Sequence, residues 1–135
     1  MRVRVYRNLA SQYRDRRAWS ILALEGPKKG RVIGVVDGAV LRDATFRVSE
    51  AGRARVLREK QKNVHAFAEG ELVESRPLDS MHPGAGGASL KRVARVPVSY
   101  DPYRGPHFVR QDTQAPIHES AWVVVSPSGV YASAS

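Results

Sequence analysis

The 135-residue sequence contains no cysteine, and this absence excludes several classes of protein. Disulfide scaffolds, thiolate zinc sites and cysteine nucleophiles all depend on the missing thiol. Long apolar runs are missing as well. Residues 122–125 form one of the longest, far below the roughly 20 residues that a membrane span needs. Residues 1–5 also lack the apolar segment of a secretory signal. We therefore expect a cytoplasmic protein with no membrane partner.

The chain is long enough for one domain with an ordinary core. Its hydrophobic content is 42%, a normal value for a globular protein, although aromatic residues make up only 7%. A chain of this length is typical of a single domain. We therefore predict one domain over residues 1–135, with a flexible loop at about residues 76–89, where proline and glycine are frequent and few side chains could pack.

Positive charge is concentrated in the first half of the chain. Residues 1–64 hold 16 bases and 6 acids, a net charge of +10, whereas residues 65–135 hold 6 bases and 7 acids, a net charge of −1. The bases comprise 17 Arg and 5 Lys, a ratio that a GC-rich genome explains. Codon usage does not explain the asymmetry. A basic half beside a near-neutral half indicates a surface that meets an anionic partner.

The hydrophobic pattern predicts short strands and one helix. Residues 2–8 alternate between apolar and cationic positions, and residues 19–24, 31–36, 45–48, 64–68, 71–73 and 90–100 have further β patterns. Asp37-Gly38 predicts a tight hairpin turn. Ser49 predicts the start of a helix near residues 50–62, with Ala51, Ala54 and Leu57 on its apolar face. The predicted fold is α+β, mainly antiparallel, in a curved sheet or small barrel.

The largest apolar residues in these segments give the expected core. They are Trp19, Val35, Val36, Leu41, Phe46, Leu57, Phe67, Val96, Val98, Trp122 and Val124.

Two stretches combine aromatic and basic residues, as nucleic-acid-binding surfaces do. One has Tyr6, Tyr13 and Trp19 beside the arginines of residues 2–17, and the other spans residues 100–108. Arginine and lysine neutralise phosphates, and aromatic rings stack on unpaired bases. A solvated strand face, and a turn whose aromatics cover the core edge, are the alternatives. The candidate binding residues are Arg2, Arg4, Arg7, Arg14, Arg16, Arg17, Lys28, Lys29, Arg55, Arg58, Lys62, Tyr100, Tyr103 and Arg104.

No residue pattern indicates a cofactor or a metal. The glycine-rich residues 84–91 lack the spacing of either phosphate-binding loop, and the histidines lack the spaced pairs of a zinc site. His65 is expected on a strand. His107 and His118 could converge, with arginines and Tyr103, on an RNA phosphate as the acid and base of a metal-independent ribonuclease. We therefore expect no cofactor and no metal.

Three classes of function fit this sequence. The leading one is a basic nucleic-acid-binding protein, largely independent of sequence, whose partner is either DNA or RNA. The second is an interaction or inhibitor protein that docks its basic face on an acidic or nucleic-acid-handling protein complex. The third is the ribonuclease. Small size and basic charge also resemble the accessory proteins of phages and mobile elements.

Overall fold

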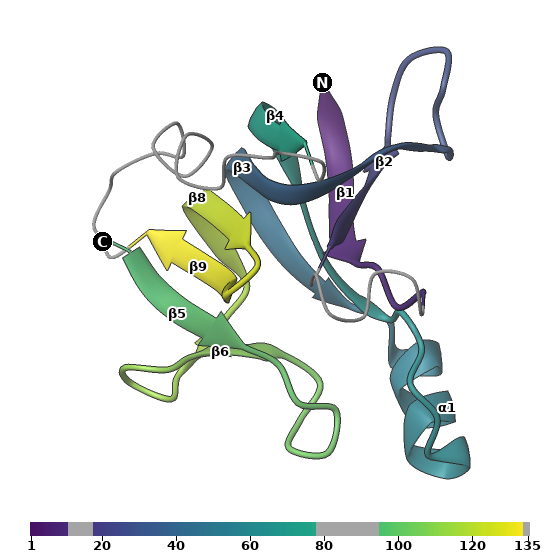
Figure 1. Ribbon diagram of the computed structural model, residues 1–135. Coiled ribbons are helices and arrows are strands. Elements are labelled where there is room, and N and C mark those ends of the chain that lie inside the picture. The colour runs from purple at the N-terminus through teal and green to yellow at the C-terminus, as the bar shows by residue number, and fades with distance from the viewer. Residues whose placement is uncertain (11–17, 78–94, 134–135) are drawn as a thin grey trace.

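The computed structural model describes residues 1–10, 18–77 and 95–133, which form one antiparallel sheet and one helix (Figure 1). The helix, α1, spans Glu50–Glu59. The strands are β1 (Arg2–Arg7), β2 (Trp19–Ala23), β3 (Val32–Val48), β4 (Ala66–Pro77), β5 (Arg95–Ser99), β6 (Phe108–Arg110), β7 (Pro116–Ile117), β8 (Glu119–Ser126) and β9 (Gly129–Ser133). The predicted class, mainly antiparallel β with a single short helix, is confirmed.

The long strand β3 organises the sheet. The strand order is β2-β1-β4-β3-β8-β9-β5-β6-β7, and β2 also pairs with β3. The residues of β3 from Val32 to Val36 pair with β2, and those from Ala39 to Thr45 pair with β8. Strands β1 to β4 thus pair in a closed circuit, and the remaining strands continue from β8.

The predicted hairpin at Asp37-Gly38 is wrong, because β3 continues through this dipeptide. The register against β4 shifts between Val36 and Gly38, which marks a bulge in place of a turn. The Asp37 carboxylate accepts a hydrogen bond from Arg76 Nε at 2.5 Å. Strand pairing on both sides of the dipeptide therefore outweighs its local preference for a turn.

Strand β4 also differs from the sequence prediction. It is one continuous strand, where the pattern indicated two segments, residues 64–68 and 71–73. A Cβ at Gly70 would lie 3.0 Å from the Arg42 carbonyl oxygen, so β3 approaches closely at this point. Arg76 and Pro77, predicted to begin the flexible loop, belong to β4, and Arg76 is buried. Residues 78–89 of that loop lie outside the described residues.

The main core lies on one face of the sheet. Val3, Leu41 and Val123 are fully buried there. Val40 and Val124 form a smaller buried cluster, and Trp122 and Tyr131 pack against it. Of the expected core residues, Trp19, Val36, Leu41, Phe46, Val96, Val98 and Val124 are buried. The others, Val35, Leu57, Phe67 and Trp122, are only partly buried.

Helix α1 begins where the sequence predicts and ends earlier. The Ser49 Oγ accepts a hydrogen bond from the Gly52 N–H at 3.2 Å, as the predicted cap requires. The helix ends at Glu59 and does not reach residue 62. Lys60 adopts the left-handed conformation, with φ of 57°, and its N–H bonds to the Val56 carbonyl oxygen. A residue in this conformation terminates a helix.

The apolar face predicted for α1 is also wrong. Ala51 and Ala54 are exposed, Leu57 is partly buried, and Val56 is the buried residue of the helix. In Figure 1 the helix extends from the lower end of the sheet, so little of its surface can be covered. Most of its side chains therefore face solvent.

Candidate nucleic-acid interface

Helix α1 lies beside the aromatic segment of residues 100–108. The Arg53 Nε donates a hydrogen bond to the Pro102 carbonyl oxygen at 3.0 Å. The His65 Nε2 and the Tyr100 hydroxyl are 2.7 Å apart, and a Cβ on Gly52 would collide with the His65 Cβ. Two candidate elements that are far apart in sequence are thus neighbours.

Tyr100 is partly buried and packs into this junction. Its ring lies 5.2 Å from the Phe108 ring and 5.3 Å from the His65 ring, measured between centroids. Burial raises the pKa of Tyr100, with a smaller contribution from Asp101 and an opposing one from Arg53. The turn alternative for this segment therefore fits Tyr100.

Tyr103 is different, because 62% of its surface is exposed. The Asp101 carboxylate accepts a hydrogen bond from the Tyr103 N–H at 2.9 Å, which fixes the turn. The Arg104 side chain is 83% exposed, and its Nε lies 3.8 Å from Asp101. An exposed pair of this kind stabilises the fold by less than about 1 kcal/mol, so Arg104 is available to a ligand.

The candidate bases of α1 are also exposed. The Arg55 side chain is 65% exposed and forms an ion pair with Glu59 at 2.9 Å. The Arg58 side chain is 71% exposed and lies 4.0 Å from the same carboxylate. Lys62 is exposed and forms no ion pair with any residue in the described part of the chain. We call the exposed candidate residues of α1, of the segment after it and of the neighbouring turn the helix surface: Arg55, Arg58, Lys60, Lys62, Tyr103 and Arg104.

A second group of bases lies on the outward face of β1, β3 and β4. Arg2 of β1 is exposed on this face; Arg7 is exposed too, but it ends the strand at a position with the parity of the inward-facing Val3 and Val5. The Arg4 Nη2 lies 2.8 Å from Glu69, whose other carboxylate oxygen lies 2.8 Å from the Arg47 Nε. We call Arg4, Glu69 and Arg47 the guanidinium triad. Arg47 is the penultimate residue of β3, close before α1, so the triad adjoins the helical end of the sheet.

Sequence reasoning missed three residues here: Arg47, Lys60 and Phe67. Phe67 was expected in the core, but its ring lies under the Arg4 guanidinium, with 4.1 Å from Cζ to the ring centroid. The signal was present in the alternation. Phe46 and Ala68 point inward, so their neighbours Arg47 and Phe67 must point outward.

The remaining candidate bases lie elsewhere. Lys28 and Lys29 are exposed in the turn between β2 and β3, which Gly26 and Gly30 close with φ values of 83°. This turn precedes β3 whereas α1 follows it, and Figure 1 shows them well apart. Arg14, Arg16 and Arg17 lie outside the described residues.

The histidines are divided between two places. His65 is buried, and its Nδ1 lies 3.0 Å from the Asn63 carbonyl oxygen. With Nδ1–H donating to that carbonyl, Nε2 accepts from the Tyr100 hydroxyl, so His65 has a structural role. His107 and His118 lie side by side across β6 and β7, with ring centroids 6.1 Å apart.

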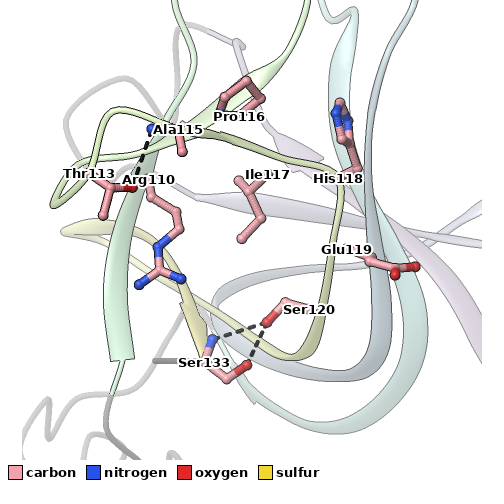
Figure 2. A pocket seen from close by; sticks show the side chains of 9 residues that line it. All are labelled: Arg110, Thr113, Ala115, Pro116, Ile117, His118, Glu119, Ser120 and Ser133. Carbon is pink, nitrogen blue, oxygen red and sulfur yellow. Dashed lines mark hydrogen bonds between the residues drawn. The ribbon is translucent and has the colours of Figure 1, made fainter. Parts of the chain in front are cut away.

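A pocket of about 470 Å³ lies beside β6, β7 and β8 (Figure 2). Its arginine, threonine and serine side chains are already paired, whereas His118 and Glu119 form no side-chain hydrogen bond or ion pair with a described residue. The Arg110 guanidinium forms two hydrogen bonds to Asp112, at 2.9 and 3.1 Å, and this contact lowers the pKa of Asp112. The Ser120 and Ser133 hydroxyls bond to each other at 2.8 Å. The pocket therefore offers a ligand few free partners.

The described ranges contain neither a metal-binding cluster nor a membrane-spanning helix. No group of three or more histidine, aspartate or glutamate side chains there could hold a metal ion. No helix in the same ranges has the length and apolarity of a membrane span. The exposed bases of the helix surface and the guanidinium triad remain as the features that point to a ligand.

Comparison with known proteins gives one relationship. A family described as the Mycobacterium phage L5 gene 82 protein matches residues 1–133. The Gene 82 protein of Mycobacterium phage L5 is 39% identical over 133 residues, which cover 98% of this chain and 95% of that protein. No solved structure matches the chain. The similarity includes every strand and the helix described above.

Proposed function

The chain belongs to the family of the Mycobacterium phage L5 gene 82 protein, and we propose that it is a small phage accessory protein that binds nucleic acid largely independently of sequence. The observation that carries this proposal is the helix surface. Residues 50–62 contain five bases and two acids. Glu59 is the acid that contacts the bases of α1, and Lys60 and Lys62 form no ion pair with a described residue.

The chemistry of these groups fits a polyphosphate backbone. Each base that contacts a phosphate displaces a condensed counterion, so affinity depends steeply on salt. The bases lie on an exposed helix and a turn, and nothing in their arrangement resembles a motif that reads base edges. Binding should therefore depend on charge and on exposed aromatic groups such as Tyr103, and weakly on sequence.

Fluorescence anisotropy at several salt concentrations tests the proposal, with duplex DNA, single-stranded DNA and RNA as ligands. If about five phosphates of duplex DNA are neutralised, log affinity falls with log salt with a slope of about −4.5. The variant Arg55→Gln/Arg58→Gln should weaken binding and reduce the magnitude of this slope by about 2, since two phosphate contacts are lost.

The matched control is Lys28→Gln/Lys29→Gln, which removes the same charge from the turn at the other end of β3. It should change the slope less than the helix variant does. Equal effects of the two variants would show that net charge alone matters and that the helix surface is not the interface. No binding to any of the three ligands at low salt would contradict the proposed function, and docking on an acidic protein complex would replace it.

One observation favours a second candidate function, the ribonuclease. The adjacent rings of His107 and His118 could act on one RNA phosphodiester. One imidazole would take the proton of the 2′-hydroxyl as its oxygen attacks phosphorus, and the other imidazolium would give a proton to the departing 5′-oxygen. Labelled RNA should then be cleaved in EDTA by the protein and not by His107→Ala or His118→Ala. RNA that stays intact would exclude this activity.

A further inference from the structure

Arg4 and Phe67 form a stack on the outward face of the sheet. Val3 and Val5 of β1 point into the core, so Arg4 points outward. Phe67 points outward from β4 because its neighbour Ala68 points into the core. In the register of the two strands Arg4 lies opposite Glu69, which makes Phe67 its diagonal neighbour. The Arg4 Cζ is 4.1 Å from the centroid of the Phe67 ring, the distance of a guanidinium lying on an aromatic face.

Glu69 fixes the orientation of this stack. One carboxylate oxygen accepts from the Arg4 Nε at 2.9 Å and lies 2.8 Å from its Nη2, and the other lies 2.8 Å from the Arg47 Nε. The Glu69 side chain is only 11% exposed, so the carboxylate is held between the two arginines. The Arg4 side chain is therefore already ordered in the free protein, so a ligand that binds it causes little further loss of side-chain entropy.

The two guanidinium groups still have unused surface. The Arg4 side chain is 36% exposed and the Arg47 side chain is 61% exposed. The triad has a net charge of +1, and the Arg47 terminal nitrogens form no ion pair with any residue in the described ranges. The Arg4 guanidinium is a planar cation held on a ring, and the Arg47 guanidinium beside it is less constrained. This arrangement suits a ligand in which a flat group is attached to an anion.

We propose that the Arg4–Phe67 stack is a binding site for an unpaired base of a single-stranded nucleic acid, with Arg47 on the neighbouring phosphate. This inference rests on the proposed function and names the form of nucleic acid that this site prefers. A nucleobase stacks on a guanidinium plane as it does on an aromatic ring. In a duplex both faces of each base are covered by neighbouring base pairs, so only a single strand can offer a face to Arg4.

The test compares variants that keep the charge and remove the stack. Arg4→Lys retains a cation that can pair with Glu69 but has no plane, and Phe67→Leu removes the ring. Arg42→Lys, at an exposed position of β3 that is not among the candidate binding residues, is the matched control. Each stack variant should bind single-stranded DNA or RNA about tenfold more weakly, since one stacked base contributes about 1–3 kcal/mol. Duplex affinity and the salt slope should stay unchanged, and the control should bind all ligands like the wild type.

A single strand that carries 2-aminopurine gives an independent readout. Its fluorescence should be quenched on binding to the wild type and less quenched by Arg4→Lys, with binding followed separately by anisotropy. Thermal denaturation checks that each variant folds, and Arg4→Lys decides the matter if Phe67→Leu does not fold. The inference is overturned if Arg4→Lys binds single strands like the wild type. It is also overturned if this variant loses single-strand and duplex binding equally. Both results leave the proposed function standing. A wild type that binds no nucleic acid removes both.

Discussion

The contact between Gly52 and His65 predicts an unusual result for a glycine-to-alanine substitution in a helix. Gly52 is the third residue of α1, and a Cβ added there would lie 2.5 Å from the His65 Cβ, 3.5 Å from its Cγ and 3.4 Å from the Ser49 Oγ. Contacts below 3.0 Å force a neighbour to move. The neighbour in this case is a Cβ, which cannot move without its backbone.

Two effects of opposite sign compete in Gly52→Ala. Alanine in place of glycine should stabilise a helix by about 1 kcal/mol. Overpacking against a fixed neighbour costs about 1–3 kcal/mol. His65 is held firmly, because its Nδ1 lies 3.0 Å from the Asn63 carbonyl oxygen and its Nε2 lies 2.7 Å from the Tyr100 hydroxyl. We therefore expect the collision to dominate and the free energy of unfolding to fall by up to about 2 kcal/mol.

Urea denaturation followed by circular dichroism measures this change. Ala51→Gly, at an exposed position of the same helix turn, is the control and should lower the free energy of unfolding by about 0.5–1 kcal/mol through propensity alone. If Gly52→Ala raises the free energy of unfolding, then α1 does not pack against His65 as described. The adjacency of the helix and the Tyr103 turn would then be in doubt as well.

Three further substitutions test contacts that hold the fold. Tyr100→Phe should lose about 1 kcal/mol with the hydrogen bond to His65. Burial raises the pKa of Tyr100 in the folded protein. The neutral tyrosine therefore contributes its full stability below the unfolded pKa of about 10 and loses it as pH rises towards the folded pKa. In urea denaturation at alkaline pH, the free energy of unfolding of the wild type should include this decrease, and that of Tyr100→Phe should not. Arg76→Ala should destabilise by about 3 kcal/mol, because Asp37 is left uncompensated, and Asp37→Ala/Arg76→Ala should recover part of that loss in thermal melts. Gly70→Ala should lower the melting temperature, since its Cβ would lie 3.0 Å from the Arg42 carbonyl oxygen, a backbone atom with little freedom; an unchanged melting temperature would contradict this close approach.

The sequence predicted the features that depend on local chemistry. Alternation of apolar and cationic residues placed Val3 and Val5 inside and Arg4 outside, and Ser49 marked the first turn of the helix. These features follow from side-chain geometry over a few residues. The fold class is a sum of such local patterns, and it was therefore predictable.

Features that depend on distant strands could not be predicted in this way. Asp37-Gly38 has the composition of a turn, but β2, β4 and β8 pair along β3 and keep it extended. The buried partner of Asp37, Arg76, is 39 residues away. Phe67 was assigned to the core because it is large and apolar, and only the register of β1 on β4 places it under Arg4. The candidate site thus depends on pairings that no short segment encodes.

Binding of nucleic acid at the helical end of this sheet is the proposal on which the others depend. Titration of the isotope-labelled protein with a short single strand, followed by amide chemical shifts, tests it residue by residue. The largest shifts should appear in α1, in the turn at Tyr103 and Arg104, and around Arg4 and Arg47. Residues near Lys28 and around the pocket at Ile117 should change little. Shifts centred on those two regions, or no shifts at all at low salt, would contradict the account.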